Sequence, residues 1–194
     1  MICSRMVRGI LLQLCLVSMA TSAYVNSWDD TFRFECPDGE HIASVGSTHS
    51  NHHEDRRWEY HCEKLSRSYT GSYFKNCAWS GFVNDFHEMV AFRCPEKGAV
   101  TGVYSIHDNR KEDRRFSFKC CQVVNYPIKE CKFTNYLNEW DGPMNYRVPD
   151  RFLLVGFASY YGKQNKLWKL PLLRGDNHDR RWKAEICRYK KCTV

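Results

Sequence analysis

The chain has 194 residues, of which 43% are hydrophobic and 26% charged, and its formal net charge is +7. This length is sufficient for one domain with a core of its own. The basic excess is spread along the chain without a dense run of Lys or Arg, which argues against a nucleic-acid-binding protein.

Residues 1–23 have the features of a secretory signal peptide. Arg5 and Arg8 precede ILLQLCLV, an apolar stretch too short to span a bilayer, and SMATSA then offers small residues for cleavage after Ala23. No later segment approaches eighteen consecutive apolar residues, so we expect no membrane span. The expected product is a secreted domain of residues 24–194 with 27 basic and 22 acidic residues.

The remaining chain is typical of an all-β protein. Short alternating runs such as TFRFEC, WEYHC, MVAFRC and RFLLVGF are separated by clusters of Gly, Asn, Asp, His and Pro. Alternation with period two predicts strands, and the clusters predict turns.

One pattern occurs three times: HEDRRWEYHC from His53, KEDRRFSFKCC from Lys111 and NHDRRWKAEIC from Asn177. Asp55 and Asp113 are 58 residues apart, and Asp113 and Asp179 are 66 apart. Repeats of this size indicate similar units that bury their apolar faces against one another. We predict one disulfide-bonded domain of three β units in a pseudo-threefold arrangement, either β-prism-like or trefoil-like.

The units extend over about residues 24–70, 71–130 and 131–194, and each opens near a tryptophan: Trp28, Trp79 and Trp140.

Within each DRR strand, alternation places the first arginine on the face of the apolar side chains. Arg56 shares a face with Trp58 and Cys62, whereas Asp55 and Arg57 point to the other. We therefore expect the first arginines to be buried and the second ones to be more exposed. We interpret the first arginines as lacing the units together, with a repeated anion site as the alternative. The residues of this structural repeat are Asp55, Arg56, Trp58, Asp113, Arg114, Phe116, Asp179, Arg180 and Trp182.

Nine cysteines follow residue 23, and in an oxidising compartment they predict a disulfide framework. There is no CxxC pair, which argues against a zinc site. Cys36 and Cys62 are 26 residues apart, and Cys94 and Cys120 repeat this spacing. Because Cys120 and Cys121 are adjacent and point to opposite strand faces, only one of them can serve a bridge within the unit, and the spacing alone leaves Cys94–Cys120 open.

The three DRR segments, the Cys120–Cys121 pair and the closing Cys187 and Cys192 resemble the dermatopontin family over essentially the whole mature chain. The resemblance implies a secreted, non-enzymatic extracellular-matrix protein without a cofactor, associated with collagen, proteoglycans and cell-surface receptors. We accordingly expect a matrix structural and adhesive protein that binds collagen, proteoglycan or other sulfated glycans. Some invertebrate members are lectins, so a carbohydrate-binding haemagglutinin of innate defence is the alternative.

The resemblance also implies a disulfide pairing. Matched positions suggest Cys36–Cys62, Cys77–Cys120, Cys94–Cys121 and Cys131–Cys192. Asn135 stands where the family has a further cysteine, and Cys187 is therefore predicted to be free.

Two loop features are candidate contact sites. Arg174, Gly175 and Asp176 form an RGD tripeptide in the loop before the third DRR strand, where an exposed tip would suit integrin binding; the alternative is a chance tripeptide. Polar side chains in the three loops could hydrogen-bond sugar hydroxyls or bind a metal, but they are equally typical of solvated turns, and we predict no metal site. The candidate glycan-loop residues are His49, Asn51, His52, His107, Asn109, Asn177 and His178.

An enzyme is not expected. The chain has no nucleophile elbow and no HExxH motif, and nothing in the sequence pairs its carboxylates.

Overall fold

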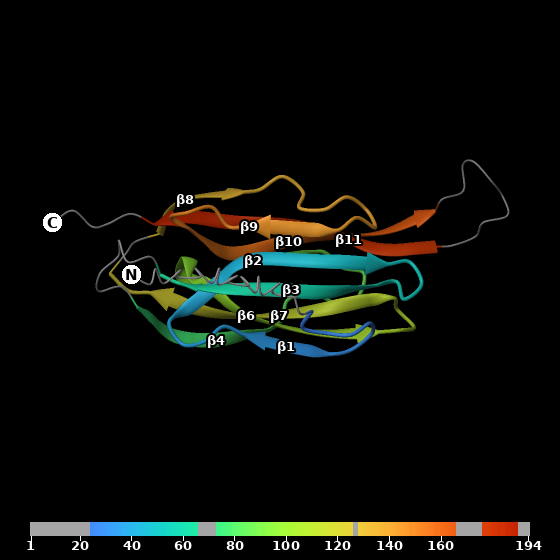
Figure 1. Cartoon of the computed structure of the whole chain (residues 1–194), viewed down its shortest axis with the longest axis horizontal. Coiled ribbons are helices and arrows are strands. Elements are labelled where there is room, and N and C mark those ends of the chain that lie inside the picture. Colours follow the sequence, from blue (N-terminus) through green and yellow to red (C-terminus); the bar gives the residue numbers. More distant parts are fainter. Residues whose placement is uncertain (1–23, 66–72, 126–127, 166–175, 190–194) are drawn as a thin grey trace, which may run out of the picture.

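The structure, a computed structural model, describes residues 24–65, 73–125, 128–165 and 176–189. The predicted signal peptide lies outside these residues. The described part contains no α-helix, and the all-β prediction is confirmed (Figure 1). Its elements are β1 (Phe32–Glu35), β2 (Glu40–Ser50), β3 (Asp55–Lys64), β4 (Phe74–Phe82), β5 (Val90–Arg93), the short 3₁₀ helix η1 (Pro95–Lys97), β6 (Ala99–Asp108), β7 (Asp113–Val123), β8 (Ile128–Phe133), β9 (Met144–Arg147), β10 (Phe152–Asn165) and β11 (Asp176–Tyr189).

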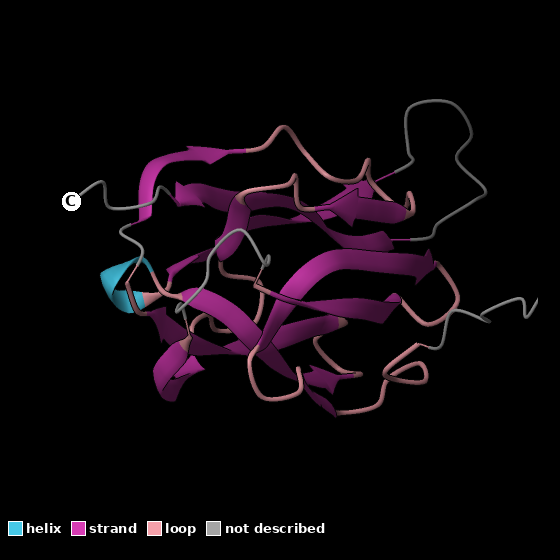
Figure 2. Cartoon of the chain, turned by 60° about the vertical axis from the view of Figure 1, so that its left-hand side comes forward, coloured by secondary structure: helices cyan, strands magenta, loops and turns pink. Residues whose placement is uncertain are grey.

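The strands form three antiparallel sheets, ordered β1-β6-β7-β4, β5-β10-β11-β8 and β3-β2-β9. Each sheet contains one long hairpin, and each hairpin ends in one DRR strand: β3, β7 or β11. Buried side chains from all three sheets share one core cluster, and Figure 2 shows the packed strands from a second side. The pseudo-threefold arrangement of the units, β-prism-like or trefoil-like, stays a prediction.

A short strand from each unit completes the sheet of another unit. β1, from the first unit, pairs with β6 of the second; β5, from the second, pairs with β10 of the third; and β9, from the third, pairs with β2 of the first. The exchange therefore runs once around the molecule and closes on itself. The sequence units are interlaced rather than placed side by side.

Three aromatic side chains of the DRR strands meet in the core. Trp58, Phe116 and Trp182 are at most 3% exposed, and their rings pack edge to face with centroids 4.9–5.7 Å apart. Edge-to-face packing of this kind adds to the free energy gained by burying the rings.

The three tryptophans near the predicted unit openings do not have equivalent positions. Trp28 and Trp140 each lie against the second arginine of a DRR strand, and in the second unit Phe86 has this position. Trp79 lies elsewhere, against Arg33.

The disulfides correct most of the predicted pairing. Cys36–Cys62 is present, but the other bonds are Cys94–Cys120, Cys77–Cys121 and Cys131–Cys187. The predicted Cys77–Cys120, Cys94–Cys121 and Cys131–Cys192 are therefore wrong, and Cys187 is bonded rather than free. Cys192 lies outside the described residues.

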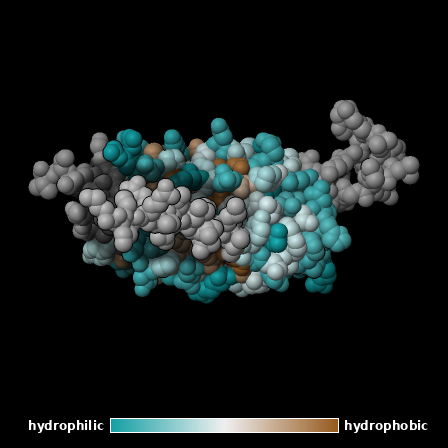
Figure 3. Space-filling view, in the orientation of Figure 1, coloured by the Kyte–Doolittle hydropathy of each residue, from teal (hydrophilic) through white to brown (hydrophobic). Residues whose placement is uncertain are grey.

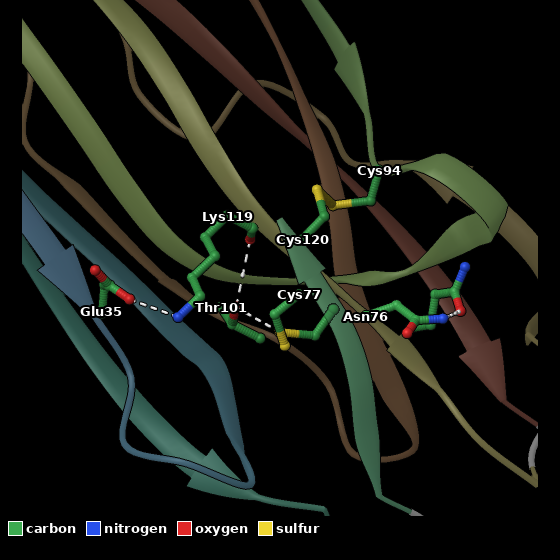
Figure 4. The surroundings of a disulfide bond; sticks show 9 residues. Glu35, Asn76, Cys77, Cys94, Thr101, Lys119 and Cys120 are labelled. Carbon is green, nitrogen blue, oxygen red and sulfur yellow. Dashed lines mark hydrogen bonds and ion pairs between the residues drawn. A yellow bond between two sulfur atoms is a disulfide. The ribbon is translucent and has the colours of Figure 1, made fainter. Parts of the chain in front are cut away.

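The reason is the alternation of the strand. Cys120 bonds Cys94 in the main core cluster (Figure 4). Cys121, the next residue of β7, points to the other face and bonds Cys77 of the edge strand β4. Cys187 follows Cys121 by 66 residues, the spacing of the second and third DRR segments, so it is the counterpart of Cys121. Its partner Cys131 lies directly opposite it on the edge strand β8.

Candidate binding site at the hairpin ends

Three buried ion pairs join the units where the DRR strands begin. Arg56 binds Asp179, Arg114 binds Asp55, and Arg180 binds Asp113, each through two hydrogen bonds of 2.6–2.7 Å. All six residues are 3–5% exposed. Each pair links two different units, as the interpretation of the first arginines as interlacing residues requires.

The second arginines of the DRR strands, Arg57, Arg115 and Arg181, are only partly buried, as predicted.

The aspartates were predicted on the wrong face. Asp55 was expected to point away from Arg56, yet both are buried. Asp55 is the first residue of its strand, so its side chain can turn inward beside the hairpin turn. There its Oδ2 also accepts a 2.8 Å hydrogen bond from the backbone N–H of Asp29, a turn residue with φ 65°. His87 and Asp141 donate in the same way to Asp113 and Asp179.

Sequence reasoning missed three buried asparagines that fix these strands. Asn26 Nδ2 donates to the carbonyl oxygen of Arg56, and its Oδ1 accepts from the N–H of Trp58. Asn84 and Asn138 make the same pair of bonds in the other units. The signal was available, since each asparagine stands two residues before Trp28, Phe86 or Trp140.

The ion pairs surround a small hollow whose inner wall is formed by Trp58, Phe116 and Trp182. It encloses about 280 Å³, its open mouth included. Figure 1 shows the ends of the β2–β3 and β10–β11 hairpins on the right, and Figure 3 shows that end as mostly hydrophilic on the face drawn.

Each DRR segment adds the residue before its aspartate to this hollow: Glu54, Glu112 and His178. Burial raises the pKa of both glutamate carboxyls. Glu54 also accepts a 2.6 Å hydrogen bond from the backbone N–H of His178. The third unit thus places an imidazole where the other two place a carboxylate.

The candidate glycan-loop residues do not form three equivalent open sites. The side chains of His49 and His107 are 1% exposed, and each lies 3.0 Å from an asparagine Oδ1, of Asn51 and Asn109 respectively. They support the turns from inside and are not available to a sugar at the surface. Exposed members of the set are Asn51, His52 and Asn109, and His178 is partly buried. The side chain of Asn177 lies outside the description.

The RGD tripeptide is only partly described. Asp176 is the first residue of β11 and pairs with Asn165, whereas Arg174 and Gly175 lie outside the described residues. Its use in cell attachment stays a prediction.

Aromatic rings and cations gather on the outer faces of two sheets, which the sequence did not predict. On the β1-β6-β7-β4 sheet, Arg33 lies 4.5 Å from the ring centroid of Trp79, and Arg115 lies 4.5 Å from that of Phe82. The Phe82 ring contacts Tyr104 at 5.7 Å between centroids. We call these five residues the second-sheet face, because the β6–β7 hairpin of this sheet belongs to the second unit.

The β5-β10-β11-β8 sheet carries a similar arrangement. Arg181 lies 3.9 Å and Lys183 4.5 Å from the ring centroid of Tyr136, which is 39% exposed. Tyr160, opposite Arg181 in the β10–β11 register, is 48% exposed. We call these four residues the third-sheet face.

The β3-β2-β9 sheet differs from these two. There Arg57 lies between Tyr24 and Trp28, but the next outward residues of β3 are Glu59 and His61.

No helix in the described part of the chain is both long and apolar enough to pass through a membrane. The fold and this arrangement define a disulfide-bonded all-β protein of three interlaced units. On two of its outer faces basic side chains lie against aromatic rings, and Arg33, Arg115 and Arg181 are also ion-paired with Glu35, Asp85 and Glu139.

Comparison with known proteins gives the class a name. The family model of dermatopontin matches residues 26–192, and the chain belongs to the dermatopontin family.

Three relatives show the breadth of this family. The hemagglutinin/amebocyte aggregation factor of Limulus polyphemus is 38% identical over 89% of this chain and 91% of its own. Dermatopontin of Biomphalaria glabrata is 34% identical over 78% of this chain and 100% of its own. Dermatopontin of Homo sapiens is 25% identical over 85% and 76%. No solved structure matches the chain.

Proposed function

We propose that this protein is a secreted, non-enzymatic adhesive protein that binds sulfated glycans of the extracellular matrix at two faces and thereby bridges them. The observation that carries the proposal is the pairing of cations with partly exposed aromatic rings on both the second-sheet face and the third-sheet face.

Each face combines the two kinds of contact that a sulfated polysaccharide needs. A guanidinium binds a sulfate through charge-assisted hydrogen bonds, and an aromatic ring offers a flat apolar surface for a sugar ring. A ring held against Arg33 or Arg181 also limits the motion of the cation, which reduces the entropy lost on binding.

Two faces on one chain account for bridging without an oligomer. The faces belong to different sheets, so one molecule can contact two polymers and gain avidity when both are engaged. Four disulfides in the described residues suit an oxidising compartment, in agreement with a secretory signal peptide at residues 1–23.

Binding to immobilised heparin as a function of salt tests the proposal. Arg33→Gln and Lys183→Gln each change one face, and Arg110→Gln is the matched control, because it removes the same charge from a side chain that is 93% exposed at a hairpin turn. We expect the first two variants to elute at lower salt than the control. Equal elution of all three variants, or elution of the unchanged protein below about 0.15 M salt, contradicts the proposal.

Bridging has a separate readout. The unchanged protein is expected to aggregate heparin-coated beads, and either face variant to lose aggregation while it still binds the beads. Aggregation by a variant with both faces changed would contradict bivalent binding.

The second candidate function is recognition of a neutral carbohydrate, favoured by the similarity to the Limulus hemagglutinin. The two functions differ in inhibition. Agglutination of red cells that is blocked by a simple neutral sugar but not by heparin supports the lectin function and contradicts the sulfated-glycan proposal.

Integrin-dependent cell attachment through Arg174, Gly175 and Asp176 is a further part of the proposed function. Asp176→Glu keeps the charge but lengthens the side chain, and we expect it to abolish cell spreading on the coated protein while heparin binding is unchanged. Undiminished spreading on the variant would exclude the tripeptide as the attachment site.

A further inference from the structure

We propose that Asp29, Asp55 and His107 form a binding site for one divalent transition-metal ion of the zinc type, independent of the glycan-binding faces. One carboxylate oxygen from each aspartate and one imidazole nitrogen all lie within 4.8 Å of one another. The three side chains come from the turn before β1, the start of β3 and the end of β6, so two units contribute.

The imidazole is the observation that points to a ligand. The side chain of His107 is 1% exposed, yet its Nε2 has no hydrogen-bond partner. This nitrogen faces Asp55 Oδ1 at 4.0 Å. On the other side of the ring, Nδ1 lies 3.0 Å from Asn109 Oδ1, which can only accept, so Nδ1 carries the proton. The free lone pair of Nε2 therefore faces Asp55 Oδ1, whereas Asp29 Oδ1 lies 3.7 Å from Nδ1 of the same ring.

This arrangement is common around protein-bound zinc. A histidine ligand usually donates its second ring N–H to an oxygen acceptor, which fixes the tautomer and the ring orientation. Asn109 has that position here. Asp29 Oδ1 is likewise buried and has no hydrogen-bond partner. Zinc ligands 2.0–2.2 Å from the ion are about 3.4 Å apart, so closure requires side-chain shifts of roughly an ångström.

The surrounding charge favours a cation. Glu112 adds a third carboxyl, close enough to interact electrostatically with Asp29, Asp55 and His107. The cation bound to Asp55 is Arg114. Arg114 binds one side of the Asp55 carboxylate and orients it. The second lone pair of Asp55 Oδ1, on the side of His107, stays available to a metal ion.

The two equivalent positions in the molecule lack this lone pair. His49 faces Asp141 and Asp179 at the same distances, 3.7 and 4.0 Å, but its Nε2 lies 3.1 Å from the carbonyl oxygen of His178. At the third position Tyr161 replaces the histidine and stacks on His87. The site is therefore specific to one junction, and His49 provides a matched control.

Zinc titration by calorimetry of the full disulfide-bonded protein, freed of metal with a chelator, tests the site. We expect one equivalent to bind, with affinity lowered 10- to 100-fold or more in Asp29→Asn and His107→Gln and unchanged in His49→Gln. Asp29→Asn suits the backbone, since asparagine tolerates the φ of 65° and the N–H bonded to Asp55 is retained. Circular dichroism of each variant confirms that it is folded.

Three results would overturn the proposal. The first is that the unchanged protein binds no zinc. The second is full zinc affinity in Asp29→Asn and His107→Gln, which would place the ion on surface histidines. The third is that His49→Gln loses as much zinc affinity as His107→Gln. Cobalt(II) gives an independent readout, because d–d absorption of low-symmetry coordination should appear in the unchanged protein and be absent in His107→Gln.

Discussion

Removal of one carboxylate from the ring of ion pairs is expected to cost more stability than any surface change. Asp113→Ala deletes the acceptor of two hydrogen bonds from Arg180 and of one from the backbone N–H of His87. Arg180 is 4% exposed, and among the described residues its guanidinium keeps a hydrogen bond to Ser159 Oγ and a contact with the Tyr161 ring at 5.6 Å. Leaving a charge buried in this way costs about 3–5 kcal/mol. In a domain of this size that is a fall of roughly 6–20 °C in melting temperature.

Guanidinium-chloride unfolding under non-reducing conditions measures this loss, with Arg110→Ala as the exposed control, for which we expect a change within about 0.5 kcal/mol. A second variant separates the causes. Asp113→Leu combined with Arg180→Met removes both charges, and we expect it to recover most of the lost stability, because well-packed apolar residues can replace a buried ion pair. A loss below about 1 kcal/mol in Asp113→Ala, or no recovery in the double variant, would refute this reasoning.

Three further predictions concern pH, packing and the odd cysteine. Burial holds the pKa of the Glu54 carboxyl above its ordinary value of 4.5, so the folded protein binds the carboxyl proton more tightly than the unfolded chain does. The resulting stability is present below pH 4.5 and is lost as pH rises through the raised pKa. Glu54→Gln should therefore flatten the fall in unfolding free energy above pH 4.5, and parallel curves for variant and parent would contradict the assignment. A Cβ at Gly156 would meet the carbonyl oxygen of Phe92 on the exchanged strand β5. Gly156→Ala should therefore destabilise the domain by about 1–3 kcal/mol in the same unfolding assay. Unchanged stability would mean that β5 can move aside. Alkylation of the native protein followed by peptide mapping should leave Cys187 unlabelled and label Cys192, and label on Cys187 would contradict its bond to Cys131.

The sequence predicted the parts of the fold that depend on local periodicity. Alternation in the DRR strands identified Arg56 and Trp58 as inward-facing, and the DRR pattern, with spacings of 58 and 66 residues, located the strands β3, β7 and β11. It could not predict the exchange of β1, β5 and β9, because nothing in a four-residue strand specifies which hairpin edge it will pair with.

The candidate sites depended still more on tertiary structure. The disulfide errors arose from transferring paired positions by resemblance, although the 26-residue spacing of Cys94 and Cys120 left the observed bond open. His107 was identified in a polar loop, but only the fold brings Asp29 from 78 residues earlier to its side. Trp79 was used as a marker of a repeat, whereas its contact with Arg33 makes it part of an outer face.

The closed exchange of strands also sets the order of events during synthesis. The first hairpin, β2–β3, pairs with a third strand formed by residues 144–147. The ion-pair partner of Arg56 is Asp179, which is translated 123 residues later. No unit can therefore reach its final structure while the ribosome is still making the third. The contacts that complete the fold are long-range, which makes folding slow and leaves unpaired strand edges exposed in the meantime. Cells that make this protein must accordingly keep its nascent chain from aggregating until the last strand has been translated.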